Sequence, residues 1–136
     1  MSREKTIEFT VPFYHTDAMQ VVWHGNYLKY FETARATLFA EAGVDLYHYY
    51  GESGYLFPVT RTATKHIHPL RYNDQCTCTA RLTECKHKLV VEFEVRLVAD
   101  GTLCARGRTE QVAIRGSDFG LELLIPETIR ARLEDS

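Results

Sequence analysis

The sequence predicts an α+β fold in which a curled antiparallel sheet of about five strands wraps around one long helix. Three observations support this prediction. Residues 6–13 alternate between polar and apolar side chains, residues 26–42 carry apolar side chains at helical spacing, and residues 56–114 read as a series of strands. A single helix this apolar must be covered, and the sheet is the element that can cover it.

The first expected strand runs from Thr6 to Phe13. Its apolar residues, beginning with Ile7, share one side, which is typical of a half-buried strand. Pro12 removes a backbone donor near the end of this stretch. We therefore expect the hydrogen-bond ladder to stop there and the chain to turn into a loop that contains Asp17.

The expected helix covers residues 26–42. Its apolar positions follow the i, i+3, i+4 rule, and Leu28 and Phe39 widen the stripe. Gly43 is well suited to the left-handed conformation that ends a helix. Residues 44–54 are rich in Tyr and Gly without a clear period, which predicts a connector with one short helical turn.

Four further strands are expected as a meander, with a short helix after them. Asp100 and Gly101 form a strong hairpin signal, and Lys86 to Lys88 supply the preceding turn. The C-terminal helix begins at Pro126, a favoured first helical residue. This is the hot-dog arrangement, and residues 1–136 are expected to form one such domain. The expected strands are 56–68, 75–85, 89–99 and 102–114, the helix is 126–133, and 115–120 is expected to be a mobile loop.

Composition excludes several classes of function. The net charge is −2 and the pI is near 6.3, so nucleic-acid binding is not expected. No apolar run approaches the roughly 20 residues that span a bilayer, and the N-terminus lacks an export signal, so we expect no membrane span and a cytoplasmic location. The four cysteines lack CxxC spacing and are expected to be reduced and partly buried.

Asp17 is the main candidate for chemistry, because it lies in an irregular loop that leads into the apolar helix. A carboxylate there suits acyl transfer, since the free N–H groups of the helix start can receive an oxyanion. Gly25 lets a substrate carbonyl approach the backbone. From spacing alone, an aspartate just before a helix is more often only a cap or a turn former.

The segment from Thr16 to Arg35 resembles the 4-hydroxybenzoyl-CoA thioesterase family of hot-dog proteins, especially its acyl-CoA thioesterase branch. The strand order extends this resemblance, more weakly, to nearly the whole chain. The residues that carry it are Thr16, Asp17, Ala18, Met19, Val21, Val22, His24, Asn26, Tyr27, Leu28, Phe31, Glu32, Ala34 and Arg35.

The resemblance implies a thioester hydrolase that cleaves acyl-CoA, with Asp17 as nucleophile or general base. The backbone N–H of His24 or Gly25 would polarise the thioester carbonyl, with Asn26 beside them at the substrate. The His24 side chain would orient the carbonyl or a water, although a solvent-facing cap explains it as well. Members of the family usually have glycine in place of Gln20, where glycine serves a positive φ or a close ligand. We therefore expect Gln20 to affect which substrate is accepted more than which reaction takes place.

No cofactor or metal is expected, because thioester hydrolysis needs neither and His15, Asp17 and His24 lack a tight metal-binding spacing. The phosphates of coenzyme A require cations near the surface. Four residues are candidates for this role, although each can equally be a solvated charge. They are Arg61, Arg71, Lys86 and Lys88.

Two alternative functions remain at this stage. The same chemistry can act on acyl carrier protein, or the chain can be a non-catalytic acyl-CoA-binding or scaffold protein. A hot-dog chain leaves a sheet edge open, so we expect a homodimer or homotetramer. The acyl group is not fixed, because Tyr27, Tyr30 and Phe31 fit an aryl pocket and a core equally well.

Overall fold

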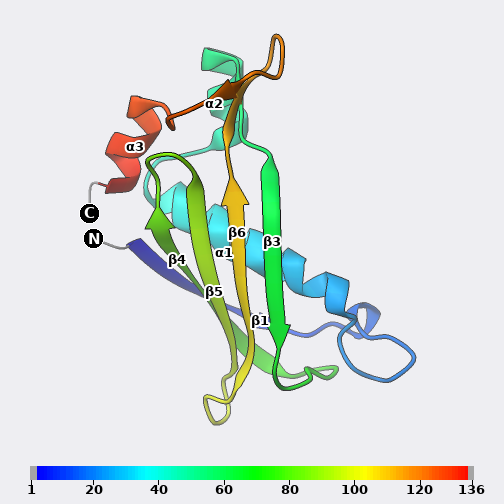
Figure 1. Ribbon diagram of the computed structural model, residues 1–136. Helices are drawn as coiled ribbons and strands as arrows, with labels where there is room; N and C mark the ends of the chain where they lie inside the picture. Colours follow the sequence, from blue (N-terminus) through cyan, green and yellow to red (C-terminus); the bar gives the residue numbers. More distant parts are fainter. Residues whose placement is uncertain (1–2, 135–136) are drawn as a thin grey trace.

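A computed structural model describes residues 3–134 of the chain. Its main sheet has five antiparallel strands in the order β1-β4-β5-β6-β3, and α1 (Tyr27–Glu41) lies across one face (Figure 1). The sheet is open rather than closed, and the arrangement is the predicted hot-dog fold. The strands are β1 (Arg3–Thr10), β3 (Val59–His66), β4 (Gln75–Glu84), β5 (Leu89–Leu97) and β6 (Leu103–Gln111).

β1 begins earlier and ends earlier than predicted. Phe13 was expected on its buried side, but it lies in the 3-10 helix η1 (Phe13–His15) and is 70% exposed. The prediction was wrong because the ladder ends before Pro12, and the backbone N–H of Val11 instead donates to Asp74 O at 2.9 Å. The chain then turns away from the sheet.

α1 matches the predicted helix within one residue at each end. Phe39 is buried as expected, but Leu28 is 42% exposed, so it does not widen the buried stripe. Leu28 lies in the first helical turn, on the side that faces away from the sheet. Gly43 adopts a φ of 76° just after the helix, which confirms the predicted helix end.

The helix rests directly on the backbone of β6. Phe31 is 1% exposed and stacks on Phe93 of β5, with ring centroids 4.6 Å apart. A Cβ atom at Gly107 of β6 would lie 2.3 Å from the Phe31 ring. Because glycine has no side chain, the Phe31 ring of α1 can pack directly on the β6 backbone at this position.

The predicted meander of four strands is wrong in one respect. β4, β5 and β6 do form a meander, and Gly101 in the last hairpin has a φ of 76°, as its turn signal predicts. β3, however, pairs with β6 at the far edge and not with β4. Residues 67–74 contain Pro69 and no tight hairpin turn, so they cross the end of the sheet instead.

Two predicted strands are each divided between the main sheet and a smaller one. Pro58 interrupts the first of them, and the second breaks after Gln111. The expected mobile loop instead joins two strands of the small sheet, and the Arg115 side chain binds Asp118 and Glu122. The small sheet contains β2 (Tyr55–Leu56), β7 (Ala113–Arg115) and β8 (Leu121–Glu122).

The connector after α1 is a full helix, α2 (Leu46–Ser53), rather than one turn. The Asp45 carboxylate caps it by accepting from the N–H groups of Tyr47 and His48. Gly54 follows the helix and adopts a φ of 80°. The sequence therefore carried a signal for each end of α2, namely Asp45 and Gly54. The C-terminal helix α3 (Glu127–Glu134) confirms the prediction.

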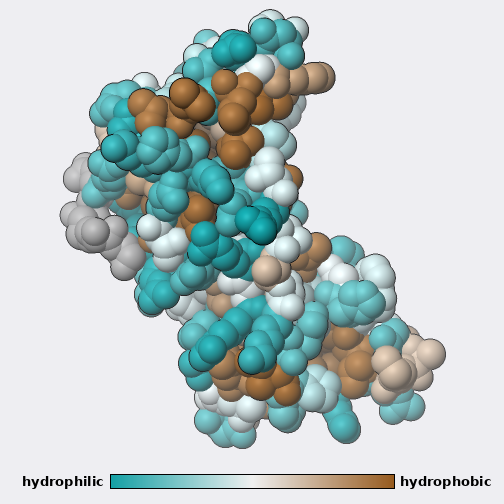
Figure 2. Space-filling model, in the orientation of Figure 1, coloured by the Kyte–Doolittle hydropathy of each residue, from teal (hydrophilic) through white to brown (hydrophobic). Residues whose placement is uncertain are grey.

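All four cysteines are free thiols, and Cys76, Cys78 and Cys104 are buried, as predicted. Burial raises the pKa of the Cys76 and Cys78 thiols to about 12. Between residues 3 and 134 no helix has both the length and the apolar character needed to cross a membrane. On the viewed face, apolar side chains gather at the upper end (Figure 2). Exposed apolar residues of the β7–β8 region are Phe119, Leu121, Leu123 and Leu124.

Candidate active site

Residues 16–22 form a tight hairpin that holds Asp17. The Asp17 N–H donates to Val21 O at 2.9 Å, and its Oδ1 accepts from the Met19 N–H at 2.8 Å. The other carboxylate oxygen has no hydrogen-bond partner within residues 3–134. The carboxylate is thus fixed through one oxygen, and the second oxygen is available to a substrate or a water.

Gln20 closes this hairpin in the left-handed conformation. Its φ is 67°, and its N–H donates to Asp17 O at 2.9 Å. A non-glycine residue in this region costs about 1–2 kcal/mol. Glycine adopts this left-handed backbone without steric cost, whereas Gln20 adopts it with an exposed side chain.

The start of the helix is tied back to the residue before the hairpin. His15 O accepts from the Trp23 N–H at 3.0 Å and from the Asn26 Nδ2 at 2.9 Å. Asn26 is 7% exposed and makes no capping bond. We expected Asn26 at the substrate, but its amide group instead holds the hairpin against the helix.

Two amides at the helix start are unpaired. The 3-10 turn η2 (His24–Asn26) leads into α1, and within residues 3–134 the N–H groups of His24 and Gly25 have no hydrogen-bond partner. Such groups carry the positive end of the helix dipole. A Cβ at Gly25 would lie 2.3 Å from the Trp23 ring. The Trp23 indole therefore occupies the space beside Gly25 where we expected a substrate carbonyl.

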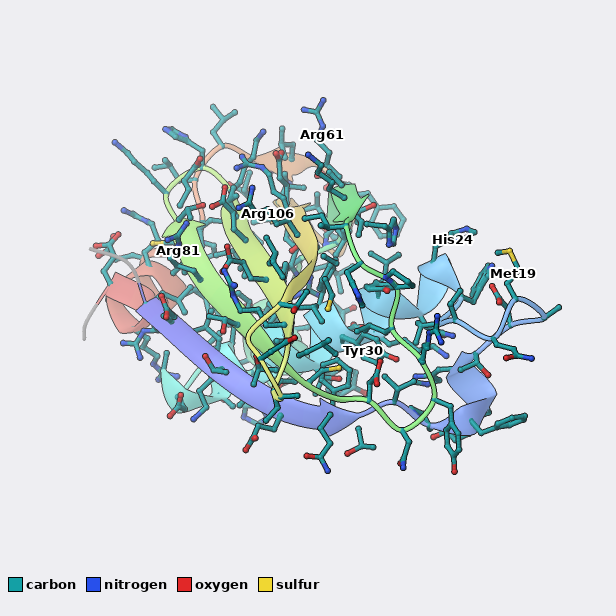
Figure 3. The ribbon with its side chains drawn as sticks, turned by 90° about the horizontal axis from the view of Figure 1, so that it is seen from below. Met19, His24, Tyr30, Arg61, Arg81 and Arg106 are labelled. Atoms are coloured by element: carbon teal, nitrogen blue, oxygen red, sulfur yellow. The ribbon has the colours of Figure 1, made fainter. Side chains whose placement is uncertain are left out.

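The His24 side chain is exposed at the same end of the molecule as Met19 (Figure 3). Its ring centroid is 6.4 Å from that of His66 on β3, and the His66 ring meets Tyr27 edge-on at 4.7 Å. His66 was not a predicted site residue. Because the two histidines are distant in sequence, only the pairing of β3 with β6 brings them together.

A polar pair lies beneath the hairpin. His15 Nδ1 and the Tyr30 hydroxyl are 2.9 Å apart. Burial lowers the pKa of His15 and raises the pKa of Tyr30, so both are neutral near pH 7. Burial also raises the pKa of Tyr27 to about 12. These neutral groups support the loop without adding charge to it.

The four expected phosphate-binding cations are not brought together. Arg71 follows Leu70, whose carbonyl accepts from the Val22 N–H at 2.8 Å, so Arg71 adjoins the hairpin. Lys88 instead forms an ion pair with Glu110 at 3.0 Å. Glu110 is the residue of β6 that lies opposite Arg61 of β3. Lys86 lies in the turn between β4 and β5. Only Arg71 is therefore close to Asp17.

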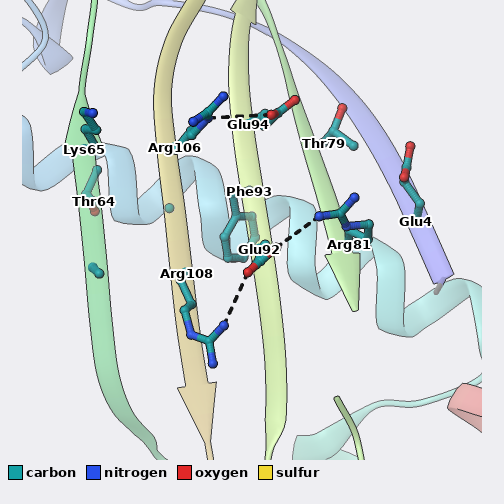
Figure 4. Close-up of a pocket in the computed structure, with 12 residues that line it drawn as sticks. Glu4, Thr64, Lys65, Thr79, Arg81, Glu92, Phe93, Glu94, Arg106 and Arg108 are labelled. Carbon is teal, nitrogen blue, oxygen red and sulfur yellow. Dashed lines mark hydrogen bonds and ion pairs between the residues drawn. The ribbon is translucent and has the colours of Figure 1, made fainter. Parts of the chain in front are cut away.

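The most prominent hollows do not include Asp17, Gln20 or His24. One, of 640 Å³, lies on the outer face of the sheet, where Glu92 binds Arg81 at 3.0 Å and Arg108 at 3.3 Å (Figure 4). Another, of 880 Å³, lies between α1 and α2. In the part of the chain that the structure describes, no three His, Cys, Asp or Glu residues could hold a metal ion. Within one chain, the Asp17 hairpin is therefore an open surface.

A family model described as the thioesterase-like superfamily matches residues 11–133. A 1,4-dihydroxy-2-naphthoyl-CoA hydrolase from Thermosynechococcus vestitus is 34% identical over 70 residues, which cover 52% of this chain and 48% of that protein. The family match begins just after β1 and extends into α3, so it includes every other strand of the main sheet and α1.

Two solved structures share the fold at low identity. A 1,4-dihydroxy-2-naphthoyl-CoA thioesterase from Synechocystis has a TM-score of 0.89 at 18% identity, covering 97% of this chain and 96% of that one. The 4-hydroxybenzoyl-CoA thioesterase from Pseudomonas sp. strain CBS-3 has a TM-score of 0.83 at 19% identity, covering 96% and 99%.

Proposed function

The chain belongs to the thioesterase-like superfamily, and we propose that it hydrolyses an acyl-CoA thioester to a free acid and coenzyme A, with Asp17 as the catalytic carboxylate. Asp17 acts as the nucleophile on the thioester carbonyl or as the general base for a water. Coenzyme A is the leaving group, and a water supplies the oxygen of the acid.

The observation that carries this proposal is the pair of unpaired amides next to a fixed carboxylate. The N–H groups of His24 and Gly25 are free at the start of a helix, and His15 O ties that start to the Asp17 hairpin. Donors held in advance stabilise a developing oxyanion without reorganisation. The indole of Trp23 has to swing aside to admit the carbonyl, which is feasible because Trp23 is 50% exposed.

Side chains around this centre position the substrate in the proposed mechanism. His24 lies beside the amides and orients the carbonyl or the water. Arg71 adjoins the hairpin and is the cation placed to meet a phosphate of coenzyme A. Gln20 preserves the hairpin backbone and extends its side chain into the space that glycine leaves empty.

The acting unit in this proposal is a homodimer. β3 is an edge strand that pairs only with β6 in the main sheet, and seven of its eight residues are exposed. An unpaired edge is a template for another strand. Aromatic residues near the hairpin, including Phe13 at 70% and Tyr14 at 81%, are also exposed. A second copy would cover them and enclose the open Asp17 surface.

The test compares Asp17→Asn with Asp45→Asn, using thiol release from short, long and aromatic acyl-CoA substrates. Both carboxylates accept backbone N–H groups, which asparagine also does, so both variants keep the wild-type thermal midpoint. We expect Asp17→Asn to lower kcat/KM at least about 100-fold. Asp45→Asn keeps full activity.

An Asp17→Asn variant with more than half of the wild-type kcat/KM on the best substrate would contradict the mechanism. Sedimentation velocity of the same samples checks that each keeps the mass of a dimer. A fully active monomer would contradict the assembly but not the role of Asp17. Matched acyl-CoA and acyl-carrier-protein thioesters then show which donor is preferred.

A further inference from the structure

A cavity of 880 Å³ lies at the opposite end of α1 from Asp17. Its walls come from the second half of α1, from α2 and from the segment around β2. Most of the lining is apolar, and it includes Phe39, Leu46 and Phe57. The lining also has two carboxylates, Glu32 and Asp45, and the Asp45 carboxylate is already engaged as the cap of α2. The volume falls in the range of small-molecule sites, which combine apolar walls with a few polar groups.

Arg35 places a poorly neutralised cation in this wall. The residue is 8% exposed, its Nη1 donates to Thr109 Oγ1 at 3.1 Å, and its nearest carboxylate is Glu32 at 3.8 Å. Burial lowers the pKa of the guanidinium. The Glu32 side chain is 74% exposed, so it neutralises the charge weakly. An anionic oxygen in the cavity would supply the missing counter-charge.

Gln111 adds an unpaired acceptor to the same wall. It is 5% exposed, its Nε2 donates to Phe57 O at 2.9 Å, and its Oε1 is buried without a hydrogen-bond partner in residues 3–134. An unpaired buried acceptor is costly. Gln111 and Thr109, the Arg35 partner, are two residues apart on β6, so their Cα atoms are about 7 Å apart and their side chains point to the same face.

We propose that this cavity binds an apolar hydroxy acid, whose carboxylate accepts from Arg35 and whose hydroxyl donates to Gln111 Oε1. The apolar body of the acid packs along Phe39, Leu46 and Phe57. The site is separate from the Asp17 hairpin of the same chain and does not depend on the proposed hydrolysis. Because Gln111 Oε1 is sealed in the structure, the Gln111 side chain has to shift for the acid to reach it.

The test is calorimetric titration of the full-length protein with 2-hydroxyoctanoate, octanoate and octanol. We expect the hydroxy acid to bind tightest, octanoate a few-fold more weakly, and octanol at least about tenfold more weakly than octanoate. The same titration with Asp17→Asn gives unchanged affinities. This result would hold even if the protein proved not to be a thioesterase.

Two variants locate the binding. Arg35→Met removes the cation and keeps the side-chain volume, so octanoate and octanol should then bind equally. Ala40→Trp fills the mouth of the cavity from an exposed helical position, so it should abolish binding even if Arg35→Met does not fold. Ala131→Trp, at an exposed position on α3, is the matched control and leaves binding unchanged. Equal affinity of the wild type for octanol and octanoate, undiminished binding by Ala40→Trp, or no saturable binding would each overturn the proposal.

Discussion

The two ends of α1 are built differently. At its start, Gln20 holds a left-handed backbone at φ 67° in the hairpin, the turn η2 replaces a side-chain cap, and two amides stay unpaired. At its end, Gly43 takes φ 76°, and the N–H groups of Gly43 and Val44 donate to Ala40 and Phe39 carbonyls. The end satisfies its backbone groups with the residue best suited to the geometry. The start leaves two amides unpaired, and the hairpin before it has glutamine rather than glycine at the left-handed position.

This contrast agrees with the proposal that the reaction takes place at the start of α1. Unpaired groups and a strained backbone reduce stability, and they persist where the surrounding structure holds them in place. Here the support is the partly buried bond to His15 O from Asn26, which is itself a buried residue. The corresponding support at the other end is the exposed Arg132 Nη1, which donates to Gly43 O at 2.7 Å. Substitutions at the two ends should therefore differ in what they change.

The largest expected effect comes from removing the buried support. Asn26→Ala should lower kcat/KM for an acyl-CoA about 10- to 100-fold, because the hairpin is no longer held against the helix start. It should lower the free energy of unfolding by about 1–2 kcal/mol. Thiol release and urea denaturation measure the two effects. Arg132→Ala is the control, and we expect full activity and a stability change within about 0.5 kcal/mol. Equal activity losses in the two variants would remove the contrast between the ends.

A smaller effect is expected at the end of the helix. Gly43→Ala should lower the free energy of unfolding by about 1–2 kcal/mol and leave kcat/KM unchanged. The cause is purely conformational, because a Cβ at Gly43 meets nothing within 4 Å. Urea denaturation measures the stability. Gly51→Ala, in an equally open position without a positive φ, is the matched control and should not be destabilising. An unchanged free energy of unfolding for Gly43→Ala would mean that the backbone at this helix end can move to a conformation that alanine adopts without strain.

The smallest effect has the opposite sign. Gln20→Gly should raise the free energy of unfolding by about 1 kcal/mol, because it relieves the left-handed strain in the hairpin. A thermal melt measures the gain, and the acyl-CoA preference of the variant reports on the vacated side-chain space. Gln75→Gly, at an exposed strand position, should be destabilising instead. If Gln20→Gly is also destabilising, the Gln20 side chain makes a favourable contact in the assembled protein.

Local periodicity was sufficient to predict most of the fold. α1, the strands β4 and β5, and α3 have the predicted type and nearly the predicted bounds, and β6 covers the first part of the strand predicted at 102–114. The errors arise where the chain depends on distant partners. The pairing of β3 with β6 joins segments that carry no mutual signal in the sequence. The helix α2 was underestimated because its Tyr-rich pattern lacks a period, although Asp45 and Gly54 marked both ends.

The site was predictable where its residues are close in sequence. Asp17, His24 and Gly25 lie within one short segment, and the motif carries them together. The bond of Asn26 to a carbonyl across the hairpin, and the place of His66 beside His24, follow from folding alone. Arg35 belonged to the motif, but only the structure places it in the wall of the same cavity as the buried amide of Gln111. The thioesterase family is confirmed, and the individual catalytic roles stay predictions.

The contact between Gly107 and Phe31 has a consequence for divergence within this fold. Phe31 follows Tyr27 by one helical turn, and Tyr27 begins the helix at the reactive end. A side chain added to β6 at position 107 would collide with the Phe31 ring, so the ring or the helix that carries it would have to move. Position 107 on the sheet can therefore influence the placement of Phe31 and of α1, although it belongs neither to the helix nor to the hairpin.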